Sequence, residues 1–172
     1  SGASYFPARE HPGRTASDAA DPFTGLSRRE NDVMLGLVRG SSLLQIAAES
    51  LVPVAGRLKQ EFGFDLFLDV TATDWPQRQP RFDVVYHFYS TRDFVRVRLK
   101  TQVEEADPTV DTLVPLYGSA RYMERECHEM YGIRFRGNDD LRPILLYEGF
   151  VGHPLRKDYP KQQEQPLVPY RS

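Results

Sequence analysis

The sequence predicts an α+β fold, in which helices pack on a small mixed β-sheet and a long extended C-terminal tail follows. Three observations predict it: apolar residues recur at helical spacing over 52–62, they alternate with basic residues from Val95 to Gln102, and proline recurs beyond Ile133. The 172 residues suffice for one domain with a core. We expect a flexible N-terminal arm, an α+β domain and an extended C-terminal segment, at 1–26, 27–135 and 136–172.

Composition excludes several classes of protein. The net charge of -2 offers no electrostatic footprint for nucleic acid or an anionic membrane surface. The single cysteine, Cys127, excludes a four-cysteine zinc or iron–sulfur site within the chain. The most apolar stretch, 42–55, is interrupted by Gln45, Glu49 and Pro53, so no membrane span is expected. Because no basic start leads into an apolar run, we expect no secretory signal and an intracellular chain.

Two helices are expected before the sheet. Residues 1–26 are rich in Ser, Gly, Pro, Ala and Asp without a period, which predicts a flexible arm. A first helix follows over 27–38, with Ser27 as its cap. A second helix is expected over 52–62, where Val54, Leu58 and Phe62 recur at i, i+4 and i+8 and Gly63 supplies the stop.

Three strands are expected next. The first covers 64–70 and is ended by the Asp-Trp-Pro run at 74–76. The second covers 82–89 and is rich in β-branched and aromatic residues. In the third, over 95–102, apolar and basic side chains alternate, which predicts one buried face and one basic, solvated face. The short turn at 90–93 predicts that the second and third strands form an antiparallel hairpin.

A short helix is expected over 110–117 and a longer one over 118–131. Met123, Cys127 and Met130 form an apolar stripe on the longer helix, and Gly132 is its stop. Beyond it neither a helix nor a strand pair is expected, because proline recurs at 143, 154, 160, 166 and 169.

Glu124 and Glu126 project from different faces of the longer helix, so they do not form a paired-carboxylate acid/base site. The charged cluster at 124–126 is either a solvated surface, or one carboxylate pairs inward with a basic residue of the extension such as Arg142. His128 lacks the second histidine that a zinc-protease motif needs, since that position holds Gly132. No phosphate-binding loop of the Walker or dinucleotide type occurs.

The stretch Gly152–Pro160 is either a surface loop or a strand that clasps a partner. Its apolar Leu155 and Tyr159 are interleaved with charged residues in a segment that proline keeps extended.

The run from Glu124 to Gly137 resembles the signature of the 30-kDa (C) subunit family of respiratory complex I, the NADH-quinone oxidoreductase, and 140–145 and 152–160 continue it in order. The body from Pro53 to Leu99 is similar to that family as well. The chain departs from the usual pattern at Tyr122, Glu129, Asn138-Asp139 and Pro143.

The resemblance implies a structural and assembly protein of the peripheral arm, on the cytoplasmic face of a bacterial inner membrane. It implies no active site, metal or cofactor in this chain, with flavin, iron–sulfur clusters and quinone in partner subunits. The partners would be the D subunit, which helps form the quinone site, and neighbouring iron–sulfur subunits. The residues assigned to an internal clamp are Glu124, Arg125, Glu126 and Arg142. Those assigned to partner binding are His153, Pro154, Leu155, Arg156, Lys157, Asp158 and Tyr159.

Three alternatives stay open. One is the equivalent protein of a membrane-bound hydrogenase or of a ferredoxin-linked or F420-linked dehydrogenase, which co-purifying partners would distinguish. A free-standing hydrolase would need a convergent acid, base or metal set, and none is visible in the sequence. A standalone binding module would be a stable monomer with an ordered tail.

Overall fold

The computed structural model describes residues 43–162. The expected arm at 1–26, the expected helix at 27–38 and residues 163–172 lie outside this range. The elements in chain order are β1 (Leu43–Gln45), the 3-10 helix η1 (Ala48–Ser50), α2 (Leu51–Gln60), β2 (Leu66–Asp74), β3 (Phe82–Ser90), β4 (Val95–Val103), β5 (Thr109–Asp111), α3 (Ala120–Tyr131) and β6 (Arg134–Arg136).

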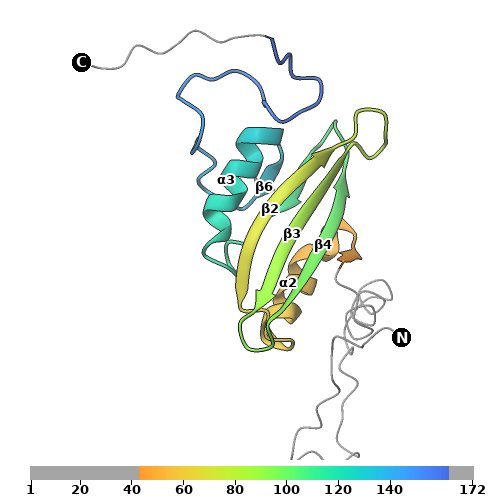
Figure 1. The fold of residues 1–172 in the computed structure, drawn as a ribbon, viewed down its shortest axis with the longest axis vertical. Helices are drawn as coiled ribbons and strands as arrows, with labels where there is room; N and C mark the ends of the chain where they lie inside the picture. The colour runs from red at the N-terminus through yellow and green to blue at the C-terminus, as the bar shows by residue number, and fades with distance from the viewer. Residues whose placement is uncertain (1–42, 163–172) are drawn as a thin grey trace, which may run out of the picture.

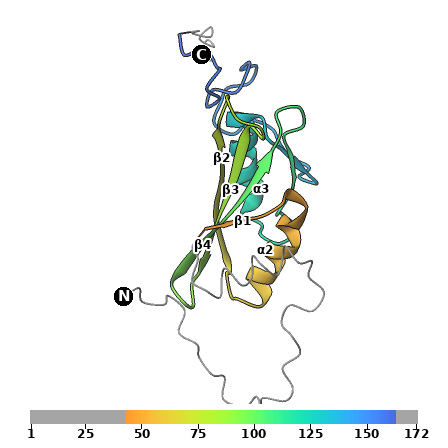
Figure 2. The same ribbon diagram turned by 90° about the vertical axis from the view of Figure 1, so that its right-hand side faces the viewer.

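The main sheet is mixed and has the strand order β1-β4-β3-β2. β2, β3 and β4 form an antiparallel meander, and β1 joins the edge of β4 in parallel. Figure 1 shows the strands in front of α2, with α3 beside β2, and Figure 2 shows α2 and α3 on the same side of the sheet. The expected α+β class, with helices on a small mixed sheet, is confirmed.

The β3–β4 hairpin follows the alternation in the sequence. Ser90 pairs with Val95 and Phe82 with Val103, so the two strands match over their full length. Val97, Leu99 and Thr101 are buried, whereas Arg96 and Arg98 are exposed. The predicted hairpin and its basic outer face are confirmed.

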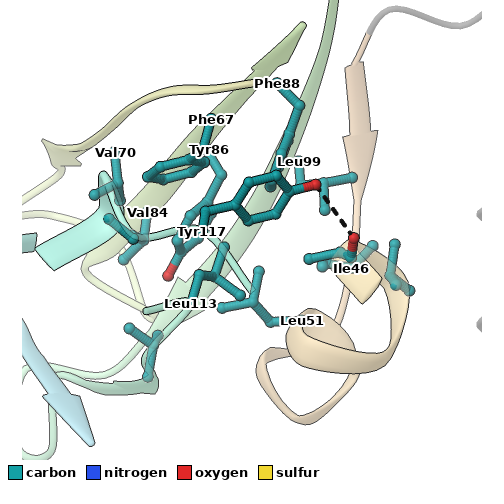
Figure 3. Close-up of a cluster of buried hydrophobic side chains, with 14 of the residues drawn as sticks. Ile46, Leu51, Phe67, Val70, Val84, Tyr86, Phe88, Leu99, Leu113 and Tyr117 are labelled. Atoms are coloured by element: carbon teal, nitrogen blue, oxygen red, sulfur yellow. Dashed lines mark hydrogen bonds between the residues drawn. The ribbon is translucent and has the colours of Figure 1, made fainter. Parts of the chain in front are cut away.

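The core lies between the sheet and the helices (Figure 3). Leu51, Val54 and Leu58 of α2 are fully buried there. The aromatic rings of Phe67, Phe88 and Tyr117 pack together, with centroids 5.3 to 5.7 Å apart. The hydroxyl of Tyr117 donates to the backbone carbonyl of Phe64 at 2.8 Å, which fastens the segment before α3 to the chain entering β2.

The expected short helix over 110–117 is wrong. Val110 lies in β5 and pairs with Phe135 of β6 in a two-stranded parallel sheet, and a single turn follows, closed by the Tyr117 N–H on the Leu113 carbonyl at 2.8 Å. The short strands β1 and β6 were not expected, and β2 continues to Asp74 rather than ending at residue 70. The strands β1, β5 and β6 share one cause, since pairing with a segment distant in the sequence decides their conformation, whereas the added residues of β2 pair with the neighbouring strand β3.

Candidate partner-binding surface

Glu124 points from α3 into the core and is fully buried. Its carboxylate accepts hydrogen bonds from the Thr112 hydroxyl at 2.6 Å, the Leu113 backbone N–H at 2.7 Å and the Asn138 amide at 2.9 Å. Burial raises the pKa of Glu124, and these hydrogen bonds oppose the rise. One carboxylate therefore joins α3 to the turn after β5 and to the start of the C-terminal segment, defined here as residues 137–162.

Glu129 organises the next part of that segment. It is a buried residue, 6% exposed, on the last turn of α3. Its two carboxylate oxygens accept the backbone N–H groups of Ile144, Leu145 and Leu146, at 3.3, 3.0 and 2.6 Å. Hydrogen bonds to a carboxylate are stronger than those between neutral groups. Glu129 therefore holds the backbone of three consecutive residues in place.

The C-terminal end of α3 is capped by residues from the same segment. The last four carbonyls of an α-helix have no partner within the helix. In α3 the first of them, on His128, accepts the N–H of Gly132 at 2.7 Å. The other three, on Glu129, Met130 and Tyr131, accept from His153 Nδ1 at 2.9 Å, the Leu155 N–H at 3.1 Å and Arg156 Nε at 2.6 Å.

The capping hydrogen bonds also determine the tautomer of His153 and the place of the Arg156 charge. A carbonyl oxygen can only accept, so the bond to Glu129 places a proton on Nδ1 of His153. The guanidinium of Arg156 puts a positive charge at the negative end of the helix dipole. It also lies over the Phe82 ring, with its central carbon 5.1 Å from the ring centroid.

Gly132 permits the close approach of this segment. Its φ of 77° is left-handed, and a Cβ there would lie 2.5 Å from Arg156 Nη2 and 2.6 Å from His153 Nε2. The predicted helix stop at Gly132 is confirmed. The capping side chains of His153 and Arg156 pack directly against this glycine.

A second anchor joins the segment to the sheet. Arg81 donates to both oxygens of Asp74, at 2.7 and 2.8 Å, and also pairs with Asp158 at 3.0 Å and Glu105 at 2.5 Å. The backbone N–H of Lys157 donates to Asp74 at 2.7 Å. The hydrogen bond from Arg81 lowers the pKa of Asp74 against the opposing effect of burial. The end of β2, the start of β3 and the C-terminal segment therefore meet at one guanidinium.

The residues predicted as a clamp take different partners from those expected. Arg125 donates to the carbonyls of Arg142 and Pro143, at 2.9 and 3.0 Å. The side chain of Arg142 pairs with Asp140 instead of a carboxylate of α3, at 2.9 and 3.0 Å, and Glu126 is exposed. The contact between α3 and the segment therefore runs from Glu124 to the Asn138 amide, from Arg125 to backbone carbonyls and to Asp140 at 3.7 Å, and from Arg121 to Asp139.

The residues predicted to bind a partner combine bonds within the chain with exposed side chains, and Asp158 shows both. His153, Arg156 and Asp158 bond within the chain, as does the Lys157 backbone. Leu155 is 49% exposed, the side chains of Lys157 and Asp158 face outward, and Pro154 and Tyr159 are half-buried. The Tyr159 ring stacks on Phe150 at 6.0 Å.

Sequence reasoning did not assign roles to Glu129, Asp74 or Arg81. One signal was available for Glu129: it stands five residues after Glu124 at the end of the helix, directly before a segment without regular structure that would need hydrogen-bond partners. Nothing local marks Asp74 and Arg81 as partners, since a turn separates them.

The segment leaves a set of apolar side chains exposed. We call them the C-terminal apolar surface: Ile144 (41% exposed), Leu145 (61%), Tyr147 (38%), Val151 (75%) and Leu155 (49%). An isolated exposed apolar residue is normal, but several in one short segment held by polar anchors are the kind of side chains that protein interfaces bury.

Within residues 43–162 no group of three or more His, Cys, Asp or Glu side chains could hold a metal ion. Burial raises the pKa of the Cys127 thiol well above its usual value, which keeps it protonated. In the same range no helix is long and apolar enough to cross a membrane.

Comparison with known proteins identifies the family. Residues 44–165 match the family described as "Respiratory-chain NADH dehydrogenase, 30 Kd subunit". The NADH-quinone oxidoreductase C subunit of Agrobacterium fabrum is 45% identical over 130 residues, covering 74% of this chain and 64% of that protein. The corresponding C subunit of Geobacter sulfurreducens is 43% identical over 125 residues, covering 72% of this chain and 77% of that one.

Three further comparisons concern architecture. The NADH-quinone oxidoreductase C/D subunit of Bdellovibrio bacteriovorus is 40% identical over 126 residues, which cover 73% of this chain and 22% of that longer one. A trypsin-resistant fragment of Nqo5 shares the fold, with a TM-score of 0.54 and 30% identity over 58% of this chain and 81% of the fragment. A chain of the archaeal membrane-bound sulfane sulfur reductase also has the fold, with a TM-score of 0.62, 24% identity and coverage of 70% and 72%. The chain described here belongs to the 30-kDa subunit family of the respiratory-chain NADH dehydrogenases.

Proposed function

We propose that this chain is a non-catalytic structural and assembly protein of the peripheral arm of a proton-translocating NADH:quinone oxidoreductase. In this proposal it packs against the quinone-site D subunit, beside the iron–sulfur subunits, on the cytoplasmic face of a bacterial inner membrane. The observation that carries the proposal is the C-terminal segment, in which many polar groups bond within the chain while several apolar side chains, among them Leu145, Val151 and Leu155, stay exposed.

The fused relative supports the D subunit as the partner. In Bdellovibrio bacteriovorus a region similar to this chain occupies 22% of a single protein named as a combined C/D subunit. Fusion holds two parts at a high effective concentration, which favours a permanent contact between them. An obligate contact of this kind buries an apolar surface such as Val151 and Leu155 provide.

The chemistry of the buried groups supports a structural role. Glu124, Glu129 and Asp74 are all engaged as acceptors of hydrogen bonds that join one part of the chain to another. Electron transfer would then take place on the flavin, the iron–sulfur clusters and the quinone of partner subunits. This chain would keep those subunits in fixed positions relative to one another.

The test replaces exposed apolar groups without touching the anchors. The double variant Val151→Asp/Leu155→Asp should fold, because both side chains are exposed, but a charge placed in an apolar interface should prevent docking. Native mass spectrometry of the complex purified through this chain should show loss of the D subunit, and NADH:quinone reductase activity should fall with it.

The matched control is Tyr122→Asp, which places an acid at another exposed aromatic residue, 56% exposed on α3. This variant should assemble normally. Normal yield of the complex and normal quinone reduction by the double variant would contradict the proposal.

A further inference from the structure

The outer face of the main sheet is a second surface with its own chemistry. α2 and α3 both cover the inner face, and the outer face is turned to the viewer in Figure 1. Three basic side chains, Arg96, Arg98 and Lys100, stand on β4 at every second residue. Alternate residues of a strand project from the same face about 7 Å apart, so the three charges form a straight row.

Strand register sets apolar and aromatic side chains beside this row. Leu66, Tyr89 and Arg96 lie opposite one another on β2, β3 and β4. In the next row Arg98 pairs with His87 on one side and with Leu43 of β1 on the other. Leu66 is 41% and Leu43 45% exposed, so the basic row is bordered by apolar groups on both sides.

The positive charge of this row is only partly compensated inside the chain, by Asp69 of β2, which lies opposite His87, and by Asp83 of β3. Within residues 43–162, Arg96 and Arg98 form no ion pair, and the guanidinium of Arg96 lies over the Tyr89 ring at 5.6 Å. Lys100 approaches Asp83 at 3.6 Å, but Asp83 is already bound bidentately by Arg78. The chain as a whole carries a net charge of -2, so this concentration of basic groups is local.

The composition of the face matches that of protein interfaces. Arginine and tyrosine are enriched among the residues that dominate binding energy, especially where apolar groups surround them. At the end of the face, the β3–β4 turn presents Phe94, which is 79% exposed and has a φ of 58°. Such a backbone conformation is unfavourable for an aromatic residue, and it directs an apolar ring away from the body.

We propose that the outer sheet face, centred on Arg96, Tyr89 and Arg98, docks an acidic segment of another protein of the complex. Arginine side chains bind carboxylates in a planar, bidentate manner, and the flanking Leu66 and Leu43 cover the stems of the acidic side chains. The proposal rests on the assembly role above but concerns a different surface from the C-terminal apolar surface. Because the outer face is basic, the partner expected there is an acidic protein segment rather than an apolar one.

The experiment uses the assembled complex. Tyr89→p-benzoylphenylalanine places a photoreactive ring at the centre of the face, and the complex is irradiated and purified through a tag on this chain. Mass spectrometry of the cross-linked peptide should identify another protein of the complex, with an excess of Asp and Glu close to the cross-link. Arg96→Glu/Arg98→Glu in the same background should lower the cross-link yield at least about tenfold, because like charges then face each other.

The matched control is Arg134→Glu/Arg136→Glu, which makes the same change in charge on two exposed arginines of β6. It should leave the cross-link intact, and Arg96→Lys/Arg98→Lys should retain most of it. Reversal of the partner's acidic residues to Lys should restore the yield in the Arg96→Glu/Arg98→Glu variant.

A cross-link to a peptide without acidic excess, to residues 1–42 of this chain or to lipid would each overturn the proposal, as would no cross-link at all. The outcome is separable from that of the assembly test. A complex that tolerates Val151→Asp/Leu155→Asp but gives the acidic cross-link would reject the first surface and keep the second.

Discussion

The guanidinium of Arg81 donates hydrogen bonds to both carboxylate oxygens of Asp74, at 2.7 and 2.8 Å. The Asp74 side chain is fully buried there, and that of Arg81 is 7% exposed. Asp74 lies at the end of β2 and Arg81 just before β3, so the pair closes the loop that joins these two strands. Since Asp158 and the Lys157 backbone bind the same pair, the position of the C-terminal segment depends on it.

Arg81→Met should strongly destabilise the chain. It leaves the Asp74 carboxylate buried without its main partner, and breaking a buried pair in this way costs on the order of 3–5 kcal/mol. Urea unfolding at pH 7 measures the loss. The control is Arg121→Met, whose partner Asp139 has a side chain 77% exposed, and which should cost about 1 kcal/mol or less. Equal losses in the two variants would mean that the Asp74 site is effectively solvated.

Glu124 should make stability depend on pH in the opposite sense from a paired surface carboxylate. Burial raises its pKa in the folded state above the ordinary value of 4.5, so folding favours its protonated form. As pH rises from 4.5 through the folded pKa, the unfolded state loses its proton first and stability falls. Unfolding free energies of the wild type and of Glu124→Gln should therefore diverge in this window, with the wild type losing stability relative to the variant. Parallel pH profiles would contradict this assignment.

Protonation of His153 in mild acid should weaken the attachment of the C-terminal segment to α3. Burial lowers its pKa from 6.5, and Arg156 and His128 add to the effect. Below pH 6.5 the unfolded state takes up a proton that the folded state resists, so stability is lost as pH falls towards the folded pKa. Hydrogen exchange, corrected for intrinsic rates, should show reduced protection of the Leu155 amide, which donates to Met130, at pH 5.5 relative to pH 7.5.

The control for that experiment lies in the same molecule and in one variant. The amide of Leu99, within the β3–β4 ladder, should keep its protection over the same interval. In His153→Asn, which cannot titrate, the change at Leu155 should disappear; its persistence would assign the effect to another group.

Gly132→Ala should weaken the contact between α3 and the segment. The left-handed φ of 77° costs a residue with a Cβ about 1–2 kcal/mol, and the new methyl would collide with Arg156 and His153. Thermal unfolding and limited proteolysis within 149–160 should both report the change. Gly118→Ala is the matched control, because a Cβ there meets nothing within 4 Å. If Gly132→Ala is no more destabilised than Gly118→Ala, the close packing at Gly132 is not important.

The parts of the fold that local sequence could predict are those with a strong period. Val95 to Gln102 alternates strictly, and the structure forms the expected hairpin. α2 and α3 were found from apolar spacing and from the glycines that end them, with bounds that differ by one or two residues. Strands β1, β5 and β6 have three residues each, too few to show a period, and only their partners define them.

The buried face of α3 shows why the site could not be predicted as well. The sequence places the apolar stripe on Met123, Cys127 and Met130, whereas the structure buries Glu124 beside Cys127 and leaves both methionines half-buried. A carboxylate can occupy the core only because Thr112, Leu113 and Asn138 come to it from other parts of the chain. Hydrophobicity alone cannot foresee such partners.

The parallel pairing of Leu43 with Arg98 joins two segments that lie far apart in the sequence. The two residues are separated by η1, α2, β2 and β3, so β1 can join the sheet only after a long loop has been closed, and such pairings are slow. The antiparallel hairpin of β3 and β4 needs no such closure and can form first. Leu43, which borders the outer face, is therefore placed by the pairing of the sheet that closes the longest loop.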